Sequence, residues 1–342
     1  MANQILNQEQ QINSAQRLGQ MASGYWISQA LRCAAVLNVA DHLKSKSQSA
    51  EELAEHLNVK SGALYRLLRA LASVGIFSED EHRLFSLTPL AEFLRSDHPH
   101  SQKSFVLMIT GAPYRAWGHL DYSINTGNAA FNETFGKSLF EYLTEHPQEG
   151  KIFDAAMTGI HGGETQPMIE AYDFSGFQTV VDIGGGNGST LAVVLNSHPK
   201  LKGVLFDMPQ VVERAKSNFV ESGLIDRVRL EGGDFFRSVT KGADAYILRH
   251  IIHDWSDDDA AAILRNCAAA MNKGGKVLIV ETVIPVNNEP CFGKWLDLMM
   301  LVIGGKERTK QQYHLLLEEA GLKLNRIIPT TAEISIIEAV LI

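Results

Sequence analysis

A short stretch of the chain places two histidines beside acidic and aromatic side chains. It reads Arg249-His-Ile-Ile-His253-Asp-Trp-Ser-Asp257 and follows an apolar run, Ala243 to Leu248, that predicts a strand. Histidine is the side chain whose proton affinity suits acid–base catalysis near neutral pH. His250 and His253 stand three residues apart at a strand-to-helix turn with no cysteine nearby, which is poor spacing for a metal site. We therefore predict that this stretch holds no metal.

A second segment with chemical potential is a glycine-rich turn. The β-branched run Thr179 to Ile183 leads into Gly184-Gly-Gly186-Asn-Gly188. Glycines suit a tight turn from strand to helix in which a ligand approaches the backbone closely. Ser189 stands where a dinucleotide fingerprint needs its third glycine. Asp182 lies directly before the turn, where a carboxylate suits a cationic or amine-bearing ligand better than a pyrophosphate.

Two more acids follow the next two predicted strands. Asp207 ends the strand from Leu201 to Phe206, where a carboxylate can accept both ribose hydroxyls of a nucleoside. Asp234 and Phe235 follow the strand from Arg227 to Leu230, and suit the exocyclic amine and the ring of a purine. Each acid taken alone is commonly a turn or capping residue. Acids at the carboxyl ends of successive parallel strands together predict a nucleoside without phosphates, S-adenosylmethionine.

The motifs and their order resemble the S-adenosylmethionine-dependent O-methyltransferases of the plant caffeate and chalcone type, their bacterial relatives that act on natural products, and the hydroxyindole O-methyltransferases. The matching segments are Asp182-Ile-Gly-Gly-Gly-Asn-Gly188, Phe206-Asp-Met-Pro209, Gly232-Gly-Asp-Phe-Phe236, His253-Asp-Trp-Ser-Asp257, Val280-Glu-Thr282 and Gly304-Gly-Lys-Glu-Arg-Thr309. The resemblance covers essentially the whole chain. It also includes Met21 to Ala30, which is similar to the family's dimerisation helix.

The resemblance implies a role for each matching residue. His253 is the general base, and Glu281 and Glu307 flank and orient its imidazole ring. The cofactor-binding residues it implies are Asp182, Gly184, Gly186, Asp207, Met208, Asp234, Phe235 and Arg249. Many plant members carry Lys at the position of Arg249, and a planar guanidinium is not equivalent to an ammonium group.

An aromatic small-molecule acceptor is expected between the helical half and the α/β half. The positions that resemble the family's acceptor pocket are Trp117, Phe153, Met157, Ile160, His161, Asp297, Met300 and Ile303. Aromatic and methionine side chains suit a flat phenolic ring. Asp297, in an otherwise apolar helix, is expected either to bond an acceptor hydroxyl or to pair within the protein. The alternatives are a relative with N- or C-methylation or another reaction of the same cofactor, and a ligand-sensing winged-helix regulator.

The elements that must position these residues fall into two patterns. Before residue 178 apolar positions recur with helical spacing, and after it short β-branched runs alternate with helices. We predict an α/β fold with a Rossmann-like methyltransferase sheet, parallel with one antiparallel strand near the C-terminus, and an N-terminal, mainly helical winged-helix dimerisation domain. The expected domains are residues 1–100, helical dimerisation and winged helix; 101–177, connecting helices of the acceptor pocket; and 178–342, the S-adenosylmethionine-binding catalytic domain.

The winged helix is predicted from local signals. Ser49 and Glu52 form a capping box for a helix ending at Leu57, and a second helix begins at Ser61. A polar turn at residues 78–81 separates two short apolar runs and predicts a hairpin. Residues 1–100 hold 9 Lys and Arg against 10 Asp and Glu, whereas a nucleic-acid footprint is basic. We therefore expect this domain to be a packing module with no nucleic-acid partner.

Composition sets the remaining bounds. The chain has 342 residues, 45% hydrophobic and 20% charged, with a formal net charge of −8 that disfavours a large phosphate-binding surface. Its three cysteines are far apart and read as reduced thiols. The polar start, Met1 to Gln20, predicts no secretory signal, and no apolar run is long enough for a membrane span. We expect a cytoplasmic enzyme of secondary metabolism without a membrane partner.

Oligomerisation is suggested by the segment from Leu18 to Leu43, which is expected to be helical. It carries apolar residues on more than one face and so needs more than one packing surface. A second copy of the chain can supply that surface by exchange of N-terminal helices, which predicts a homodimer. The alternative is that the rest of the same chain covers it.

Overall fold

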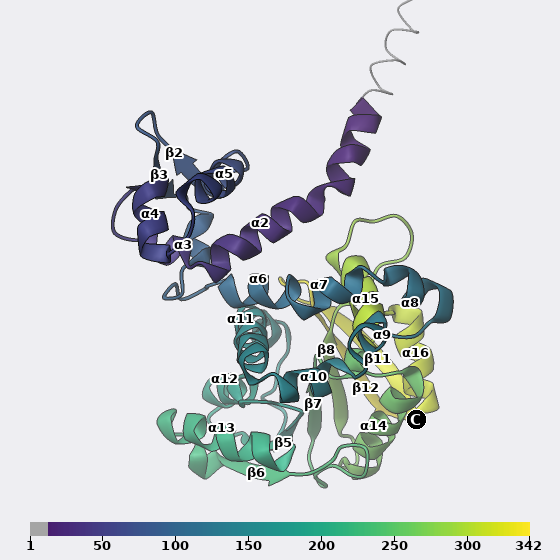
Figure 1. Cartoon of the computed structure of the whole chain (residues 1–342). Helices are drawn as coiled ribbons and strands as arrows, with labels where there is room; N and C mark the ends of the chain where they lie inside the picture. The colour runs from purple at the N-terminus through teal and green to yellow at the C-terminus, as the bar shows by residue number, and fades with distance from the viewer. Residues whose placement is uncertain (1–12) are drawn as a thin grey trace, which may run out of the picture. The chain divides into compact units, whose positions relative to one another are not determined.

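The computed structural model of the chain describes residues 13–342, except for the side chain of His161 (Figure 1). The expectation for that side chain, and part of the expectation that residues 1–20 hold no secretory signal, therefore fall outside the described residues. The chain divides into two compact units, described separately below. The first extends to Arg115 and includes His146–Gly159, and the second comprises Ala116–Glu145 and Ile160–Ile342.

This division differs from the predicted boundaries at residues 100 and 177. Helices within Ala116–Glu145 belong to the second unit. Two of them, α8 (Leu120–Thr126) and α9 (Ala130–Phe135), contact α15 (Phe292–Ile303), which lies far away in the sequence. Local periodicity does not reveal contacts between helices that are far apart in the sequence. The predicted boundary was therefore set where helical spacing gives way to β-branched runs.

The first unit contains the predicted winged helix. Its sheet has the order β1-β3-β2, with both pairings antiparallel, and the capping box of Ser49 and Glu52 is confirmed. The expected helix from Leu18 to Leu43 is interrupted near Asn38, which adopts a left-handed φ of 58°, a conformation that asparagine tolerates. The elements are α2 (Gly24–Val36), α3 (Val39–Leu43), β1 (Gln48–Ser49), α4 (Ala50–Leu57), α5 (Ser61–Ala72), β2 (Phe77–Glu79), β3 (Leu84–Leu87), η1 (Ala91–Leu94) and α6 (Lys103–Ile109), with residues 13–22 also helical.

Three further helices lie wholly or partly in the second unit. They are α7 (Ala112–Trp117), α10 (Leu139–Glu145) and the long α11 (Pro147–Ala171). Because α7 and α11 cross the division between the units, each contributes residues to both. Within the described residues, no helix is long and apolar enough to cross a membrane.

The second unit is built on a seven-stranded sheet with the order β11-β12-β8-β7-β4-β5-β6. Strand β12 runs antiparallel to both of its neighbours, and all other pairs are parallel, which confirms the predicted sheet. The strands are β4 (Thr179–Ile183), β5 (Lys202–Asp207), β6 (Val228–Gly232), β7 (Ala245–Arg249), β8 (Lys276–Glu281), β11 (Leu322–Pro329) and β12 (Ser335–Leu341).

Helices bury both faces of this sheet. Alternate residues of each strand point to opposite faces, so Val181 packs in a core with α14 (Asp257–Ala270) and α16 (Lys310–Glu319), whereas Val180 packs in a core with α12 (Ser189–Ser197) and α13 (Pro209–Glu221). The predicted cap of α14 is confirmed, because the Ser256 hydroxyl accepts the N–H of Asp259. Parallel strands with both faces covered bring their carboxyl ends to one edge, which is where the predicted site residues lie.

A small two-stranded sheet brings a further segment to that edge. Strand β9 (Val283–Ile284) pairs in parallel with β10 (Arg308–Thr309), with Val283 opposite Arg308. The segment from Gly304 to Thr309 is therefore held beside the end of β8, close to the chain that follows β7.

Candidate active site

His253 lies in η3 (Ile252–Asp254), a short 3-10 turn directly after β7. Its ring nitrogen Nδ1 is 2.7 Å from Oε1 of Glu307, and the two side chains are 12% and 0% exposed. An ionised carboxylate only accepts hydrogen bonds, so Nδ1 carries the proton in this contact and the neutral ring leaves Nε2 as its basic atom. Oδ1 of Asp254 lies 3.6 Å from that Nε2. The arrangement presents a basic nitrogen with an adjacent carboxylate.

The electrostatic surroundings make His253 an unusually strong base. Burial by itself lowers the pKa of the imidazole, but the carboxylates of Asp254, Glu307 and Glu281 outweigh burial and raise the pKa from 6.5 to about 10. Burial also raises the pKa of Asp254, to about 6, although the cationic form of His253 opposes that rise. A free phenol titrates near 10. His253 thus approaches the proton affinity of a phenolate.

Glu281 hydrogen-bonds to the main chain of His253 and not to its ring. Its Oε1 accepts the main-chain N–H of His253 at 3.0 Å, and its Oε2 accepts the hydroxyl of Tyr313 at 2.6 Å. Both Glu281 and Tyr313 are fully buried. Tyr313 is a site residue that sequence reasoning missed, because its position in α16 looks like any apolar core position of an amphipathic helix.

The segment before β10 completes the support of the turn. The main-chain N–H of Lys306 donates to the carbonyl of His253 at 2.7 Å. Gly305 approaches the same carbonyl so closely that a Cβ at this position would overlap its oxygen. Gly305 therefore has a steric reason to be glycine, and its neighbour Gly304 has a φ of 111°, which favours glycine.

The glycine turn after β4 and the end of β5 are joined by hydrogen bonds. Gly184, Gly186 and Gly188 have φ values of 66°, 58° and 76°, which side-chain-bearing residues rarely adopt. Asp207 accepts the N–H of Gly186 through Oδ2 at 2.9 Å and the N–H of Met208 through Oδ1 at 2.7 Å. These two hydrogen bonds hold its carboxylate in one orientation at the edge of the sheet. Burial raises the pKa of Asp207.

Asp182 lies beneath the glycine turn. It is 1% exposed, its Oδ2 has no hydrogen-bond partner within residues 13–342, and a Cβ on Gly185 would overlap that oxygen. Burial raises its pKa to about 7. The carboxylate also accepts the main-chain N–H of Leu191 and lies near the charge of Arg249. A buried oxygen without a hydrogen-bond partner is costly, so Oδ2 favours a cation bound above the turn.

The loop after β6 contributes an aromatic surface. Oδ1 of Asp234 accepts the N–H of Phe236 at 2.9 Å. The ring of Phe235 lies 4.9 Å from that of Phe236 and 6.0 Å from that of Trp255, both edge to face. Ile251 and Phe235 also border Gly184, where a Cβ would overlap Ile251. Aromatic and apolar side chains thus meet the glycine turn.

These residues fit S-adenosylmethionine. The turn holds no Lys or Arg to neutralise phosphates, the orphaned Asp182 oxygen favours a cation, and Asp207 stands fixed at a strand end suited to ribose hydroxyls. The predicted cofactor residues follow the carboxyl ends of β4, β5, β6 and β7, which are neighbours in the sheet.

Arg249 is the last residue of β7, and its guanidinium is held by protein groups. It donates to the Thr165 hydroxyl at 2.7 Å, to the Thr190 hydroxyl at 2.9 Å and to Glu164 at 2.9 Å. Glu164 also contacts Nε2 of His250 at 2.8 Å. Arg249 thereby ties α11 and α12 to the sheet. Among the residues described, no three His, Cys, Asp or Glu side chains form a group suited to a metal ion.

Several predicted acceptor residues gather around α15. Oδ1 of Asp297 accepts the N–H of Glu307 at 2.9 Å, so the internal pairing expected as one alternative occurs. The indole N–H of Trp117 lies 3.2 Å from Sδ of Met299. Met300 is buried beside Gly305. The other predicted acceptor residues of the second unit are Ile160 and Ile303, both partly buried, whereas Phe153 and Met157 belong to the first unit.

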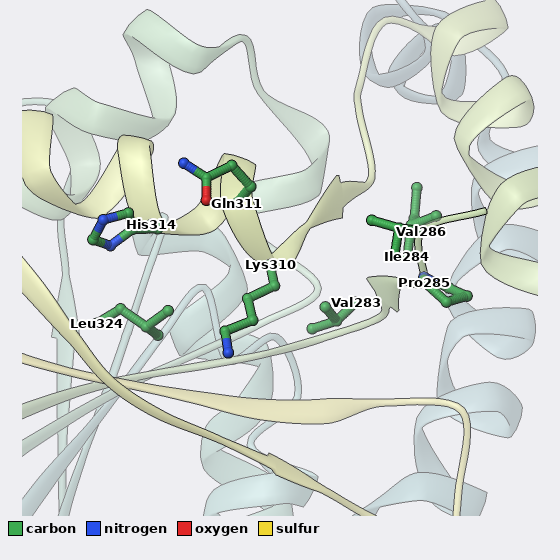
Figure 2. Close-up of a pocket in the computed structure, with 8 residues that line it drawn as sticks. All are labelled: Val283, Ile284, Pro285, Val286, Lys310, Gln311, His314 and Leu324. Carbon is green, nitrogen blue, oxygen red and sulfur yellow. The ribbon is translucent and has the colours of Figure 1, made fainter.

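A separate hollow lies between β9, α16 and β11. It has a volume of about 530 Å³, and Figure 2 shows Lys310 extending between Leu324 and Val283. No residue predicted for the site lines it. The lining residues are Val283, Ile284, Pro285, Val286, Lys310, Gln311, His314 and Leu324.

Two family models and curated relatives match most of the chain. Residues 117–323 match the model of the O-methyltransferase domain, and residues 20–97 match that of the O-methyltransferase dimerisation domain. A phenazine O-methyltransferase of Lysobacter antibioticus is 44% identical over 321 residues, which cover 94% of each chain.

Solved structures agree with this match. The mitomycin 7-O-methyltransferase MmcR has a TM-score of 0.92 at 34% identity, covering 98% of this chain and 100% of the other. The O-methyltransferase NcsB1 from neocarzinostatin biosynthesis, solved with S-adenosylmethionine and 2-hydroxy-5-methyl naphthoic acid, has a TM-score of 0.83 at 34% identity and covers 92% and 96% of the two chains. The chain therefore belongs to the S-adenosylmethionine-dependent O-methyltransferase family and carries both the catalytic and the dimerisation domain of that family.

Proposed function

We propose that this O-methyltransferase methylates a phenolic hydroxyl of an aromatic natural product, with His253 as the general base. The observation that carries the proposal is the 2.7 Å contact between Nδ1 of His253 and Glu307, which leaves Nε2 as the basic nitrogen. The raised pKa of His253 suits a phenol, because proton transfer is most efficient when the two proton affinities are close.

In the proposed reaction, separate residues hold the cofactor and move the proton. Asp207 binds the ribose, Asp234 and Phe235 bind the adenine, and Asp182 with the glycine turn favours the cationic end of the cofactor. S-adenosylmethionine supplies a methyl group that its sulfonium activates. Nε2 of His253 takes the proton of the acceptor hydroxyl, and Glu307 stabilises the imidazolium that forms. Asp254, 3.6 Å from Nε2, adds negative charge beside that cation.

The acceptor class rests on two supports. The aromatic and sulfur-bearing side chains of Trp117, Met299 and Met300 suit a flat ring. The two methionines lie in α15, the helix that also carries Asp297, and Trp117 contacts Met299. The relatives named above act on phenazine and mitomycin skeletons, or were solved with a hydroxynaphthoic acid. A fused aromatic ring with a free hydroxyl is therefore the acceptor that we propose.

The test is a labelled-methyl transfer assay with a panel of acceptors. Hydroxyphenazines, hydroxynaphthoic acids and catechols are compared with the corresponding aromatic amines, and mass spectrometry locates the methyl group in each product. We expect O-methylated products only. In His253→Ala, turnover should be lost while calorimetry still detects S-adenosylmethionine binding. Wild-type turnover in that variant, or transfer to the amines alone, would refute the proposal.

We also propose that the chain forms a homodimer through its N-terminal helices. Large apolar side chains of this region are exposed, including Met21, Tyr25 and Trp26 at 65%, 52% and 65%. An apolar surface of this kind is unfavourable in water and marks a contact with another protein. Sedimentation should give twice the mass of one chain. Replacing Tyr25 and Trp26 together by Ser should yield a monomer, and an unchanged dimer would contradict this interface.

A further inference from the structure

Arg308 is a buried cation that the proposed chemistry does not use. Its side chain is 0% exposed, and it immediately follows Glu307. A buried guanidinium requires pairing. Its charge partner is Asp257, which lies 2.9 Å from Nε but is itself 50% exposed.

Three of the four side-chain hydrogen bonds of Arg308 go to main-chain carbonyls, those of Ile252, Trp255 and Lys306. Nη1 donates to the carbonyl of Ile252 at 3.0 Å, and Nη2 donates to the carbonyl of Trp255 at 3.0 Å. These two carbonyls stand on either side of His253 and Asp254 in the chain. The rigid, planar fork of an arginine can hold two such acceptors at once, which a lysine ammonium cannot reproduce.

An unfavourable backbone conformation lies two residues before the turn that Arg308 holds. His250, just before η3, has a φ of 52°, in the left-handed region that residues with a side chain rarely adopt. Such a conformation persists only where surrounding contacts over-determine it. The N–H of His253 is held by Glu281 and its carbonyl by the N–H of Lys306, and Arg308 holds the carbonyls at the two ends.

We propose that Arg308 is a positioning residue for the catalytic histidine: it fixes the turn Ile252–Trp255 and so aims Nε2 of His253 at the acceptor. This inference rests on the proposed role of His253 as the base. Adjacent residues then divide the task, because Glu307, just before β10, contacts the ring and Arg308, in β10, fixes the main chain that carries it. The alternative is that Arg308 only stabilises the fold.

The chain offers a matched control in Arg227. Its guanidinium also binds main-chain carbonyls, those of Leu195, His198, Pro199 and Leu201, at 2.9 to 3.3 Å. These carbonyls belong to the last turn of α12 and to the segment that leads into β5, at the opposite end of the strands from His253. Arg227→Lys and Arg308→Lys therefore make the same chemical change, and only one of them touches the histidine turn.

The experiment compares the two variants with the wild type in three measurements. These are kcat and KM with the best acceptor of the panel, the dissociation constant of S-adenosylmethionine by calorimetry, and hydrogen exchange of residues 250–256 by mass spectrometry. Misplacing a catalytic group by about 1 Å can slow a reaction roughly 100-fold. We expect Arg308→Lys to lower kcat by roughly 10- to 100-fold and to speed exchange of the turn, with the dissociation constant for S-adenosylmethionine unchanged. Arg227→Lys should keep wild-type kcat and wild-type exchange in the turn.

Two results would overturn the proposal. One is wild-type kcat in Arg308→Lys, and the other is an equal loss of kcat in both variants, which is the signature of a general loss of stability. If Arg308→Lys does not fold, Asp257→Ala removes the acceptor that orients the guanidinium, and Asp258→Ala is its control in the same first turn of α14. Asp257→Ala should then lower kcat roughly 3- to 10-fold relative to Asp258→Ala, and equal values in the two would contradict the proposal.

A failure of the proposed role of Arg308 can be told apart from a failure of the proposed role of His253. If His253 is not the base, His253→Ala keeps its turnover. The exchange measurement on Arg308→Lys needs no acceptor and reports the turn directly.

Discussion

Replacing Glu307 with glutamine tests how the protein gives a histidine the proton affinity of a phenolate. Glu307 is fully buried and accepts the Nδ1 proton of His253 at 2.7 Å. Glutamine keeps the shape of the side chain but removes the negative charge, and its amide can donate to Nδ1, which puts the ring proton on Nε2. In that tautomer Nε2 cannot take the proton of the acceptor, so the remaining activity comes from molecules in which the amide oxygen faces Nδ1.

The size of the effect follows from the pKa values. A free imidazole lies about 3.5 pKa units below a phenol, which corresponds to roughly 5 kcal/mol of unfavourable proton transfer. The surroundings of His253 raise its pKa to about 10 and nearly remove that gap. Asp254 and Glu281 contribute to that rise besides Glu307, so Glu307→Gln restores only part of the gap. The full gap would slow the reaction by about 3000-fold, which is the upper limit, and we expect a loss of at least about 10-fold.

The assay is a pH profile of kcat and of kcat/KM with saturating S-adenosylmethionine. A base acts only when it is neutral, so the raised pKa of His253 predicts that wild-type activity climbs with pH toward about 10. In Glu307→Gln the climb should begin at lower pH and end on a lower plateau. The two profiles should therefore approach each other near pH 7 and separate above pH 9.

Calorimetry provides the control. In the described part of the chain the hydrogen bonds of Glu307 go to His253 and Asp297 and not to a predicted cofactor residue, so the variant should bind S-adenosylmethionine like the wild type. A plateau within threefold of the wild type, or a climb at unchanged pH, would refute the assignment of Glu307 as the residue that tunes His253.

Further substitutions probe the rest of the site. Burial raises the pKa of Asp182 from 3.8 to about 7. The free energy of unfolding is therefore highest below pH 3.8 and falls as the pH rises through 7. Asp182→Asn carries no charge, so it should raise the free energy of unfolding at pH 8 by up to roughly 4 kcal/mol. The same variant should bind S-adenosylmethionine more weakly. Denaturant titration measures the gain in stability, and calorimetry measures the loss of affinity. Tyr313→Phe leaves one oxygen of Glu281 without its donor, which should cost about 1 to 3 kcal/mol of stability in urea unfolding. Gly305→Ala forces a Cβ onto the carbonyl of His253, so kcat should fall at least about 10-fold while the affinity for S-adenosylmethionine, measured by calorimetry, stays unchanged.

Local signals in the sequence predicted the framework well. The strands, the glycine turn and the helix caps at Ser49 and Ser256 follow from β-branched runs, from turn residues and from capping side chains, and the structure confirms these elements. The interruption of the N-terminal helix at Asn38 was missed, because a left-handed asparagine leaves no mark in the apolar pattern. The division between the two units was also placed differently, because α8 and α9 pack on a helix that follows them by more than a hundred residues.

The sequence by itself determined which residues reach the site. Parallel strands bring their carboxyl ends to one edge regardless of loop detail, so Asp182, Asp207, Asp234 and His253 could be placed together from their positions at strand ends. Only the tertiary structure decided which atoms meet. The carboxylate of Glu281 binds the main chain of a residue 28 positions away, and Arg308 binds a carbonyl 56 positions away. Such contacts depend on how the loops after different strands pack together, and a buried tyrosine or arginine that makes them looks, in the sequence, like any other residue of a helix or strand.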